Sequence, residues 1–191
     1  MVTVRSHITT ILGFLNTLNL VAGYDAFRDY ARMSEWMSEH GLLEDPSLQE
    51  IALAVEVREA VRHLLHEGNA PSCSSREVLE RAAGMAQVSL HFELEGAAIR
   101  STNPGLDRAI AEFLIAVYSA MADGTWERIR VCRNPECRWA FFDQSRNRAR
   151  MWCSMAECGN KMKARRFRRR GARLAAGPAA PGGRHSGEQK I

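Results

Sequence analysis

The sequence lacks the features by which most membrane proteins and many enzymes are recognised. No apolar run is long enough to cross a membrane, and Asn16 and Asn19 interrupt the apolar segment near the start, which has no clear cleavage site. The chain also lacks a glycine-rich phosphate loop, a Gly-x-Ser-x-Gly elbow and a convincing pair of acid and base residues. We therefore expect a cytoplasmic protein that contacts no membrane and is not an enzyme.

Positive charge is scarce in the first two thirds of the chain and negative charge is scarce in most of the rest. Residues 1–127 contain eighteen acidic residues against nine arginines, whereas residues 128–173 contain fifteen Lys and Arg against three acids. The formal net charge of +4 hides this asymmetry. Because a polyanion is attracted to the second part and repelled by the first, we expect only residues 128–173 to contact nucleic acid.

Four of the five cysteines lie in one short segment with the spacing C-x4-C-x15-C-x4-C, at Cys132, Cys137, Cys153 and Cys158. Two pairs of closely spaced thiols supply the four ligands that a tetrahedral zinc ion requires. No histidine lies between residues 130 and 173, so the site is expected to be structural rather than catalytic. Four unrelated cysteines or two disulfides are the alternatives, although nothing else in the sequence indicates an oxidising compartment.

The residues around these thiols predict a small zinc fold. The segment 138–142 is short and aromatic, so it should form one strand of a hairpin with Asn134 and Pro135 in the turn. Three aromatic side chains would cover the metal, namely Trp139, Phe141 and Trp152.

A helix is expected to start after the third cysteine, where Ser154 and Glu157 form a capping box. Helical spacing would direct three side chains toward the zinc, namely Met155, Cys158 and Met162.

Beyond the last cysteine this helix is almost entirely cationic. Like charges one turn apart, such as Lys161 and Arg165, destabilise an isolated helix, and a polyanion would relieve their repulsion. A solvated basic face or a disordered tail is the alternative. We interpret the helix, with two arginines before it, as a nucleic-acid-binding surface. Its residues are Arg148, Arg150, Asn160, Lys161, Lys163, Arg165, Arg166, Arg168, Arg169 and Arg170.

The segment Cys153-Ser-Met-x-x-Cys158-Gly-Asn-Lys161, preceded by Phe142-Asp-x-Ser145 and Cys132-x4-Cys137, resembles the CGNR zinc finger of bacterial proteins. That finger usually follows an N-terminal domain called ABATE, in a family described as stress-induced transcriptional regulators. The resemblance implies four cysteine ligands for Zn2+ and binding to DNA. Lys161 stands where the family name has arginine, so the charge for a phosphate contact is kept but the bidentate fork for a base contact is lost.

A second short segment, Phe14-Leu-Asn-Thr17, resembles a motif near the start of the ABATE domain. Because buried polar side chains need hydrogen-bond partners, Asn16 and Thr17 are expected either to fix a loop or to line a pocket.

Apolar periodicity and cap signals predict a helical first domain. We expect helices within residues 1–23, over 25–40, from 45 to 68, over 76–86 and over 106–122, the last being central to the core through residues that include Phe113 and Met121. The second helix should bury Phe27, Tyr30, Met33 and Met37 and end at Gly41 in a left-handed conformation. The third should open with Asp45 as its cap and Pro46 as its first residue, and the fourth should follow a capping box of Ser74 and Glu77.

The remaining segments of this domain predict a hairpin and a loop. Residues 88–94 alternate apolar and polar and should pair antiparallel with 97–102 through Glu95 and Gly96, with one buried face. The loop over 69–75 holds Cys73, which we expect to be inert. His63 and His66 on the third helix are expected to be partly exposed rather than metal ligands.

These patterns together predict an α+β fold. We expect a mainly helical domain over residues 1–127, a four-cysteine zinc finger of a β-hairpin and a basic helix over 128–173, and a disordered tail over 174–191. The short connection should keep the finger docked on the first domain.

The first functional hypothesis is a zinc-dependent DNA-binding transcriptional regulator, whose N-terminal domain forms a homodimer or senses a small-molecule effector. RNA or ribosome association, with Phe167 or Trp139 stacking on bases, is the second hypothesis. The third is a protein-docking finger attached to a small-molecule-binding domain.

Overall fold

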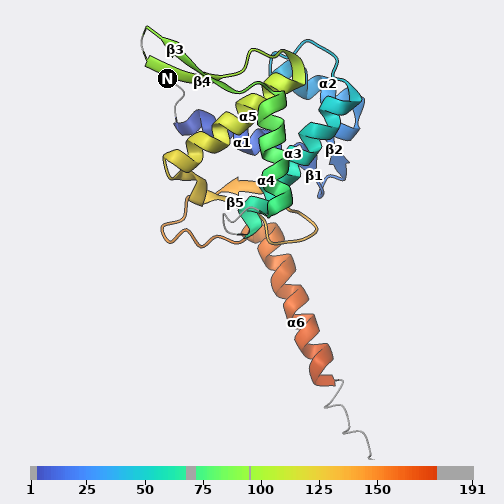
Figure 1. Cartoon of the computed structure of the whole chain (residues 1–191). Helices are drawn as coiled ribbons and strands as arrows, with labels where there is room; N and C mark the ends of the chain where they lie inside the picture. The colour runs from blue at the N-terminus through green and yellow to red at the C-terminus, as the bar shows by residue number, and fades with distance from the viewer. Residues whose placement is uncertain (1–3, 68–71, 95, 176–191) are drawn as a thin grey trace, which may run out of the picture.

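A computed structural model of the chain describes residues 4–67, 72–94 and 96–175. Within these ranges helices dominate, and three antiparallel sheets of two strands each complete the fold, so the predicted α+β class is confirmed. A helical body comes first, and the last helix extends away from it as a rod (Figure 1). None of the helices in the described ranges has the length and apolarity needed to cross a membrane.

The elements of the body come first along the chain, and those of the finger follow. In the body these are α1 (Val4–Leu15), β1 (Leu18–Asn19), β2 (Tyr24–Asp25), η1 (Ala26–Arg28), α2 (Tyr30–Glu39), α3 (Leu48–Glu67), α4 (Cys73–Met85), β3 (Ser89–Glu93), β4 (Gly96–Arg100), α5 (Gly105–Ala122) and η2 (Thr125–Arg128). In the finger they are β5 (Ile129–Val131), β6 (Ala140–Phe142), η3 (Met155–Gly159) and α6 (Asn160–Ala175).

The core of the body is built around α5, which packs most extensively against α1. Nine residues of α5 are buried, and Phe113 stacks on Phe14 of α1 with ring centroids 4.2 Å apart. The predicted apolar central helix is therefore confirmed. Met121, which was predicted to face the core, is 44% exposed because the buried stripe of α5 passes through the preceding residue instead.

The helix predicted over residues 25–40 is divided in two. The 3-10 turn η1 ends at Arg28, and the carboxylate of the next residue, Asp29, caps α2 by accepting a hydrogen bond from the Arg32 amide. This break turns Tyr30 outward, where it is 66% exposed, so its predicted place in the core is wrong. Gly41 has the left-handed conformation predicted for the end of α2, with a φ of +67°.

Two helices of the body begin at a serine cap that differs from the predicted one. The hydroxyl of Ser47 accepts a bond from the Glu50 amide, and the Glu50 carboxylate accepts one from the Ser47 amide, so α3 begins later than predicted. Asp45, the predicted cap, accepts a hydrogen bond from the hydroxyl of an α2 tyrosine. α4 begins at Cys73 with Ser72 as its cap, so this cysteine lies in a helix rather than in a loop.

The sequence predicted one of the two hairpins of the body. Strands β3 and β4 pair antiparallel with Leu90 opposite Ile99, as expected, but β1 and β2 are too short to show an alternating pattern and were missed. The apolar face predicted to be buried is exposed, since Phe92 is 82% accessible and Leu94 fully so. Figure 1 shows the reason, because the β3–β4 hairpin projects beyond the helices that would cover it.

The finger lies against the body. Its strands β5 and β6 form the predicted hairpin, with Arg130 opposite Phe141, and β5 contacts α3 while β6 contacts α1. Helix α6 continues to Ala175 and so includes the first two residues of the predicted tail. The rest of that tail, residues 176–191, lies outside the described residues, as does Glu95 of the predicted hairpin turn.

Candidate metal centre and nucleic-acid interface

Four thiols of the finger converge on one point. Cys132 follows β5, Cys137 precedes β6, Cys153 precedes the turn η3 and Cys158 lies within that turn. Their sulfur atoms all lie within 4.8 Å of one another. Over the described parts of the chain, no other group of three or more His, Cys, Asp or Glu side chains is placed to hold a metal ion.

The geometry of this cluster fits a tetrahedral zinc ion. Cys153 Sγ lies 3.5 Å from Cys137 Sγ and 3.7 Å from Cys158 Sγ. Zinc–thiolate bonds of about 2.3 Å would separate the sulfurs of a tetrahedron by about 3.8 Å. A disulfide requires about 2.0 Å between sulfurs, and all four thiols are free, so the disulfide alternative is wrong. Four thiolates leave no coordination position open for a reacting water, as a structural site requires.

Asn134 organises the turn between the first two cysteines. Its buried side-chain amide donates to Cys158 Sγ at 3.5 Å, and its side-chain oxygen accepts a bond from the Glu136 amide. Its backbone carbonyl accepts a further bond from the Cys137 amide. Sequence reasoning placed Asn134 in a turn but missed that the same side chain supports a thiolate on the opposite segment.

Burial controls the ionisation of the thiols. It raises the pKa of Cys137 to about 11 and raises the pKa of Cys153 further still. Burial acts in the same direction on Cys158, but hydrogen bonds from Asn134 and the neighbouring thiols lower the pKa of Cys158 below its ordinary value. Since thiolates crowded together in an apolar pocket repel one another, the cluster requires a cation to ionise fully.

Aromatic side chains shield the cluster as predicted. Phe141 is buried with the thiols, and Trp139 and Trp152 pack against them. The packing is close at Gly159, where an added Cβ would lie 3.3 Å from Trp152 Cδ1 and 2.7 Å from Met155 Sδ.

The turn after Cys153 has the predicted cap but an unexpected winding. Ser154 Oγ accepts a hydrogen bond from the Glu157 amide at 3.3 Å, which confirms the start of the helix. The first turn, η3, is a π turn, so it is wider than an α-helical turn and rotates the residues around it. Met155 is consequently 49% exposed, and its predicted orientation toward the zinc is wrong.

Asn16 joins the body directly to the finger. Its side-chain amide donates to the Ala140 carbonyl at 3.0 Å, and its side-chain oxygen accepts from the Ala140 amide at 2.8 Å. The side chain thus pairs with β6 as a neighbouring strand would. Arg62 of α3 closes the same junction by donating to the carbonyls of Leu15, at 2.6 Å, and Arg138, at 2.5 Å.

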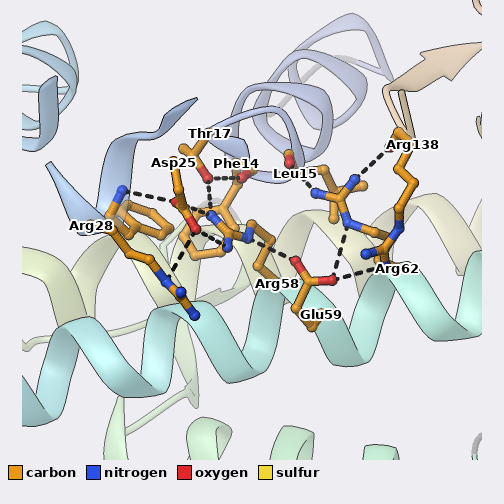
Figure 2. A network of polar contacts seen from close by, with 10 residues as sticks. Phe14, Leu15, Thr17, Asp25, Arg28, Arg58, Glu59, Arg62 and Arg138 are labelled. Carbon is orange, nitrogen blue, oxygen red and sulfur yellow. Dashed lines mark hydrogen bonds and ion pairs between the residues drawn. The ribbon is translucent and has the colours of Figure 1, made fainter. Parts of the chain in front are cut away.

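A buried polar network in the body supports this junction (Figure 2). The guanidinium of Arg58, whose side chain is 2% exposed, donates two bonds of 2.7 Å to the Asp25 carboxylate and one of 3.0 Å to the Thr17 hydroxyl. Burial alone raises the pKa of Asp25, but the bond and charge of Arg58 outweigh it and lower that pKa. Burial lowers the pKa of Arg62 to about 10, so this guanidinium remains charged at neutral pH.

Sequence reasoning predicted that Asn16 and Thr17 would fix a loop or line a pocket, and it missed both arginines. The bonds of Asn16 and Thr17 show the first role, whereas the pocket stays a prediction. One signal could have found the arginines. Arg58 and Arg62 are one turn apart on α3, within a stripe that also holds the buried apolar residues Leu53, Val57, Val61 and Leu64.

Helix α6 carries the predicted cationic surface. It extends away from the body (Figure 1). All its Lys and Arg side chains up to Arg170 are exposed. Arg165 pairs with Glu136 at 2.8 Å, and within the described residues no other cation of α6 has an ion-pair partner. A cleft of about 840 Å³ separates α6 from the loops of the finger, and it is lined by Trp152, Met162, Lys163, Arg166, Arg169 and Arg170 among others.

Besides Arg165, three of the residues predicted to contact nucleic acid have partners within the chain. Arg150 donates to the carbonyls of Trp152 and Cys153 and lies over the Phe141 ring, so it supports the metal loop. Arg148 pairs with an acidic residue of η2 at 2.6 Å, and the Asn160 amide donates to a carbonyl of the preceding turn. Their contact with nucleic acid stays a prediction.

The remaining candidates from the sequence do not belong to the group of potential metal ligands found in the described residues, although His63 and His66 line a cleft that Cys132 also lines. His63 and His66 are exposed and line a small cleft between α3 and the finger, beside Arg133. Cys73 is exposed on the first turn of α4.

Comparison with known families follows this division of the molecule. Residues 9–123, more than half of the chain, match the family model ABATE, described as "Putative stress-induced transcription regulator". Residues 128–171 match the family model of the CGNR zinc finger. No curated protein matches the sequence.

Proposed function

The chain belongs to the ABATE family, and we propose that it regulates transcription by binding duplex DNA through α6 of its zinc-ordered finger. The observation that carries this proposal is the exposed charge of α6, most of which has no ion-pair partner among residues 4–67, 72–94 and 96–175. In this proposal the body binds no DNA itself but forms a homodimer or receives a signal. The whole protein acts in the cytoplasm and catalyses no reaction.

The charge of α6 is better explained by a polyanionic partner than by helix stability. Lys161 with Arg165, and Arg166 with Arg170, are like charges one turn apart, and each such pair costs an isolated helix about 0.2–0.5 kcal/mol. Phosphate groups bound between these cations would offset their mutual repulsion by attracting both. The metal and the cap at Ser154 hold the first turn in place, so the charges are presented on an ordered rod.

Phosphate contact is the expected role for most of these side chains. Lys163 and Arg166 line the cleft between α6 and the metal loop, where a DNA backbone strand could lie. Arg169 and Arg170 line the same cleft further along the helix. Lys161 retains the charge for a phosphate contact, whereas a bidentate base contact would require arginine.

Neutralising three α6 arginines tests the proposal. Arg166→Gln, Arg169→Gln and Arg170→Gln in one zinc-loaded protein should weaken binding to duplex fragments by at least tenfold at low salt. Each lost phosphate contact should also reduce the slope of log affinity against log salt by about 0.9. The matched control replaces three exposed arginines of the body, Arg76, Arg81 and Arg108, with glutamine. Equal losses in both proteins, measured by fluorescence anisotropy, would contradict the proposal.

Structured RNA is a second candidate because Phe167, in the middle of the cationic helix, is 79% exposed. An exposed aromatic ring between cations can stack on an unpaired base. Trp139, the other aromatic residue considered for stacking, packs against the thiols instead. Competition between duplex DNA and structured RNA at equal salt separates the two candidates. If RNA is the partner, Phe167→Ala should weaken RNA binding by about 1–3 kcal/mol and leave duplex binding nearly unchanged.

A further inference from the structure

A cleft of about 400 Å³ opens between the turn that joins β1 to β2 and the metal cluster. Its walls come from both regions of the molecule, since Val21 and Ala22 belong to the body and Trp139 belongs to the finger. Two of the four thiols, Cys137 and Cys153, also line it. The volume is many times the share of about 30 Å³ that one water molecule has in the liquid, so small solutes can reach these two sulfurs.

The four thiols differ in their accessibility. Cys132, Cys137 and Cys158 are each at most 4% exposed, whereas Cys153 is only partly buried. Oxidation of cysteine depends on thiolate character and on exposure to the oxidant. Cys153 is therefore the thiol of this cluster at which oxidation should begin.

Cys153 has the surroundings of a reactive thiol. The guanidinium of Arg150 donates to the carbonyls of Trp152 and Cys153, so a positive charge lies beside this cysteine. Reactive cysteines typically lie in such electropositive and partly exposed places. Zinc held by the four sulfurs would keep Cys153 deprotonated, and the thiolate is the form that attacks an oxidant. Hydrogen peroxide is uncharged, so Glu157 in the wall of the cleft does not repel it.

A second sulfur lies close enough to complete a disulfide with Cys153. Cys137 Sγ is 3.5 Å from Cys153 Sγ, and both residues line the same cleft. Cys158 Sγ is nearly as close, at 3.7 Å, but this buried sulfur also accepts a hydrogen bond from the Asn134 amide. Because a disulfide requires the two sulfurs to approach to about 2.0 Å, the closer and less restrained Cys137 is the better partner.

We propose that Cys153 is an oxidation site for hydrogen peroxide and other small hydroperoxides, with Cys137 as the resolving thiol. In the first step the Cys153 thiolate attacks one oxygen of hydrogen peroxide, the O–O bond breaks and hydroxide leaves, so Cys153 becomes a sulfenic acid. In the second step the Cys137 thiolate attacks the Cys153 sulfur, the S–O bond breaks and a second hydroxide leaves. The two sulfurs lose two electrons to the peroxide, and the two hydroxides take up two protons to give water.

Formation of this disulfide removes two of the four ligands of the metal centre. Cys132 and Cys158 alone do not satisfy a structural zinc ion, which takes four ligands. The buried cluster inside the finger is small, so loss of the ion should disorder the finger. A thiol reductant and zinc should together restore it, because a disulfide can be reduced whereas a sulfinic acid cannot be reduced by thiols.

Hydrogen peroxide is the probe, and it is added to the zinc-loaded full chain carrying Cys73→Ser, which removes the exposed thiol of α4 from the measurement. A chromogenic chelator should report one zinc ion released for each disulfide formed. Mass spectrometry of proteolytic peptides should find Cys137 linked to Cys153. A main product that links Cys153 to Cys158, or thiols that stay reduced in millimolar peroxide, would overturn the proposal.

A further variant tests the path to the sulfurs without changing a ligand. Ala22→Trp, at an exposed position of the turn between β1 and β2, should fill the cleft and slow the release of zinc by peroxide at least fivefold. The zinc content before oxidation should stay unchanged. Ala97→Trp places the same side chain at an exposed position of β4 and is the matched control. Equal rates of zinc release in the two variants would show that peroxide does not enter through this cleft and would overturn the proposal.

The effect of oxidation on DNA binding is measured separately, and this step rests on the proposed function. Oxidation should weaken the affinity for a duplex fragment at least tenfold, and treatment with dithiothreitol and zinc should restore it. Failure of the reduced, zinc-loaded chain to bind DNA would count against the proposed function and not against the oxidation site, which zinc release still reports. An unchanged DNA affinity in the disulfide form would overturn the coupling of oxidation to DNA binding.

Discussion

The main apolar cluster lies in the body, extends from Ile11 of α1 through Phe113 of α5 and also takes in Ile129 and Ala140 of the finger hairpin, whereas the second cluster, inside the finger, consists of three cysteines and Phe141. An apolar core as large as that of the body can stabilise a domain without a metal ion or a disulfide. A cluster of four buried residues cannot, so the finger depends on the metal that its thiols bind. The two regions should therefore fail under different perturbations, although Asn16 and Arg62 join them.

The largest effect is expected from Cys153→Ser, which removes one ligand of the finger. Zinc binding to such sites contributes about 10–16 kcal/mol, so its loss should unfold the finger and reduce DNA affinity by at least 100-fold. Elemental analysis should show that the zinc is lost, and circular dichroism should show that the helicity of the body is nearly unchanged. Fluorescence anisotropy should show the loss of DNA affinity. Cys73→Ser, at an exposed cysteine of α4, is the control and should change none of these. A metal-free variant with full DNA affinity would show that the finger does not depend on its metal.

Arg58→Ala should destabilise the body and leave the finger and its zinc in place, which is the reverse of the result expected for Cys153→Ser. Removing one partner of a buried ion pair costs about 3–5 kcal/mol, because the Asp25 carboxylate is then left buried without its cation. Urea unfolding should report this loss in the body, while the folded protein still binds its zinc. Arg76→Ala removes an exposed ion pair and should cost less than about 1 kcal/mol. Similar losses in the two variants would show that the Figure 2 network does not stabilise the body.

Asn16→Ala should uncouple the two regions without destroying either. It leaves the amide and carbonyl of Ala140 without their partners, at a cost of about 1–3 kcal/mol. Two separate thermal transitions should then replace a joint one, and the zinc content should stay unchanged. Asn16→Asp keeps the acceptor for the Ala140 amide but loses the donor, so its effect should be intermediate. A single unchanged transition in Asn16→Ala would mean that other contacts hold the junction.

The finger and the body should unfold at different pH values on acidification. The pKa of Asp25 is depressed below its ordinary value of 3.8, so its pairing stabilises the body fully above about pH 4 and is lost as the pH falls through the lower folded value. The thiolates of the finger are protonated in competition with zinc at higher pH, so the finger should unfold first. Asp25→Asn should be less stable than the unmodified protein at pH 6, and the two should converge as the pH falls below the depressed pKa of Asp25. Stability measured by urea unfolding from pH 2 to 6 tests this, and a constant difference would contradict it.

The smallest effect is expected at the surface of the finger. Glu136→Gln removes the ion pair with Arg165, whose partners are 69% and 51% exposed, so stability should change by less than about 0.5 kcal/mol. The same change frees one cation of α6 and should raise DNA affinity by no more than about threefold. A stability loss of several kcal/mol would show that α6 is held by this pair rather than by the metal and the η3 turn.

Local patterns in the sequence were sufficient for the finger and for the main helices. The cysteine spacing, the box of Ser154 and Glu157 and the cationic run after Cys158 each depend on neighbours in the chain, and each predicted its element. One error in the body, the start of α3, arose where two local signals competed. Asp45 and Ser47 are both good helix caps, and only Ser47 has a glutamate three residues later to complete the box.

The contacts between distant segments could not be predicted from local patterns. Asn16 and Ala140 are 124 residues apart, and no period or spacing connects them. The same holds for the contact of Asn134 with Cys158 and for the exposure of Phe92, which depends on whether another element reaches the hairpin. An alternating strand pattern shows that one face is apolar but not that anything covers it.

The sequence by itself determined that this protein has an acidic helical part, a four-thiol metal site and a cationic helix, because ligand spacing, helical periodicity and net charge are properties of contiguous residues. Only the tertiary structure decided that the Asn16 side chain pairs with β6, that Arg58 and Arg62 are buried, and that β5 and β6 pack against α3 and α1. These features require residues far apart in the chain to meet, and the packing of the whole core selects which ones do.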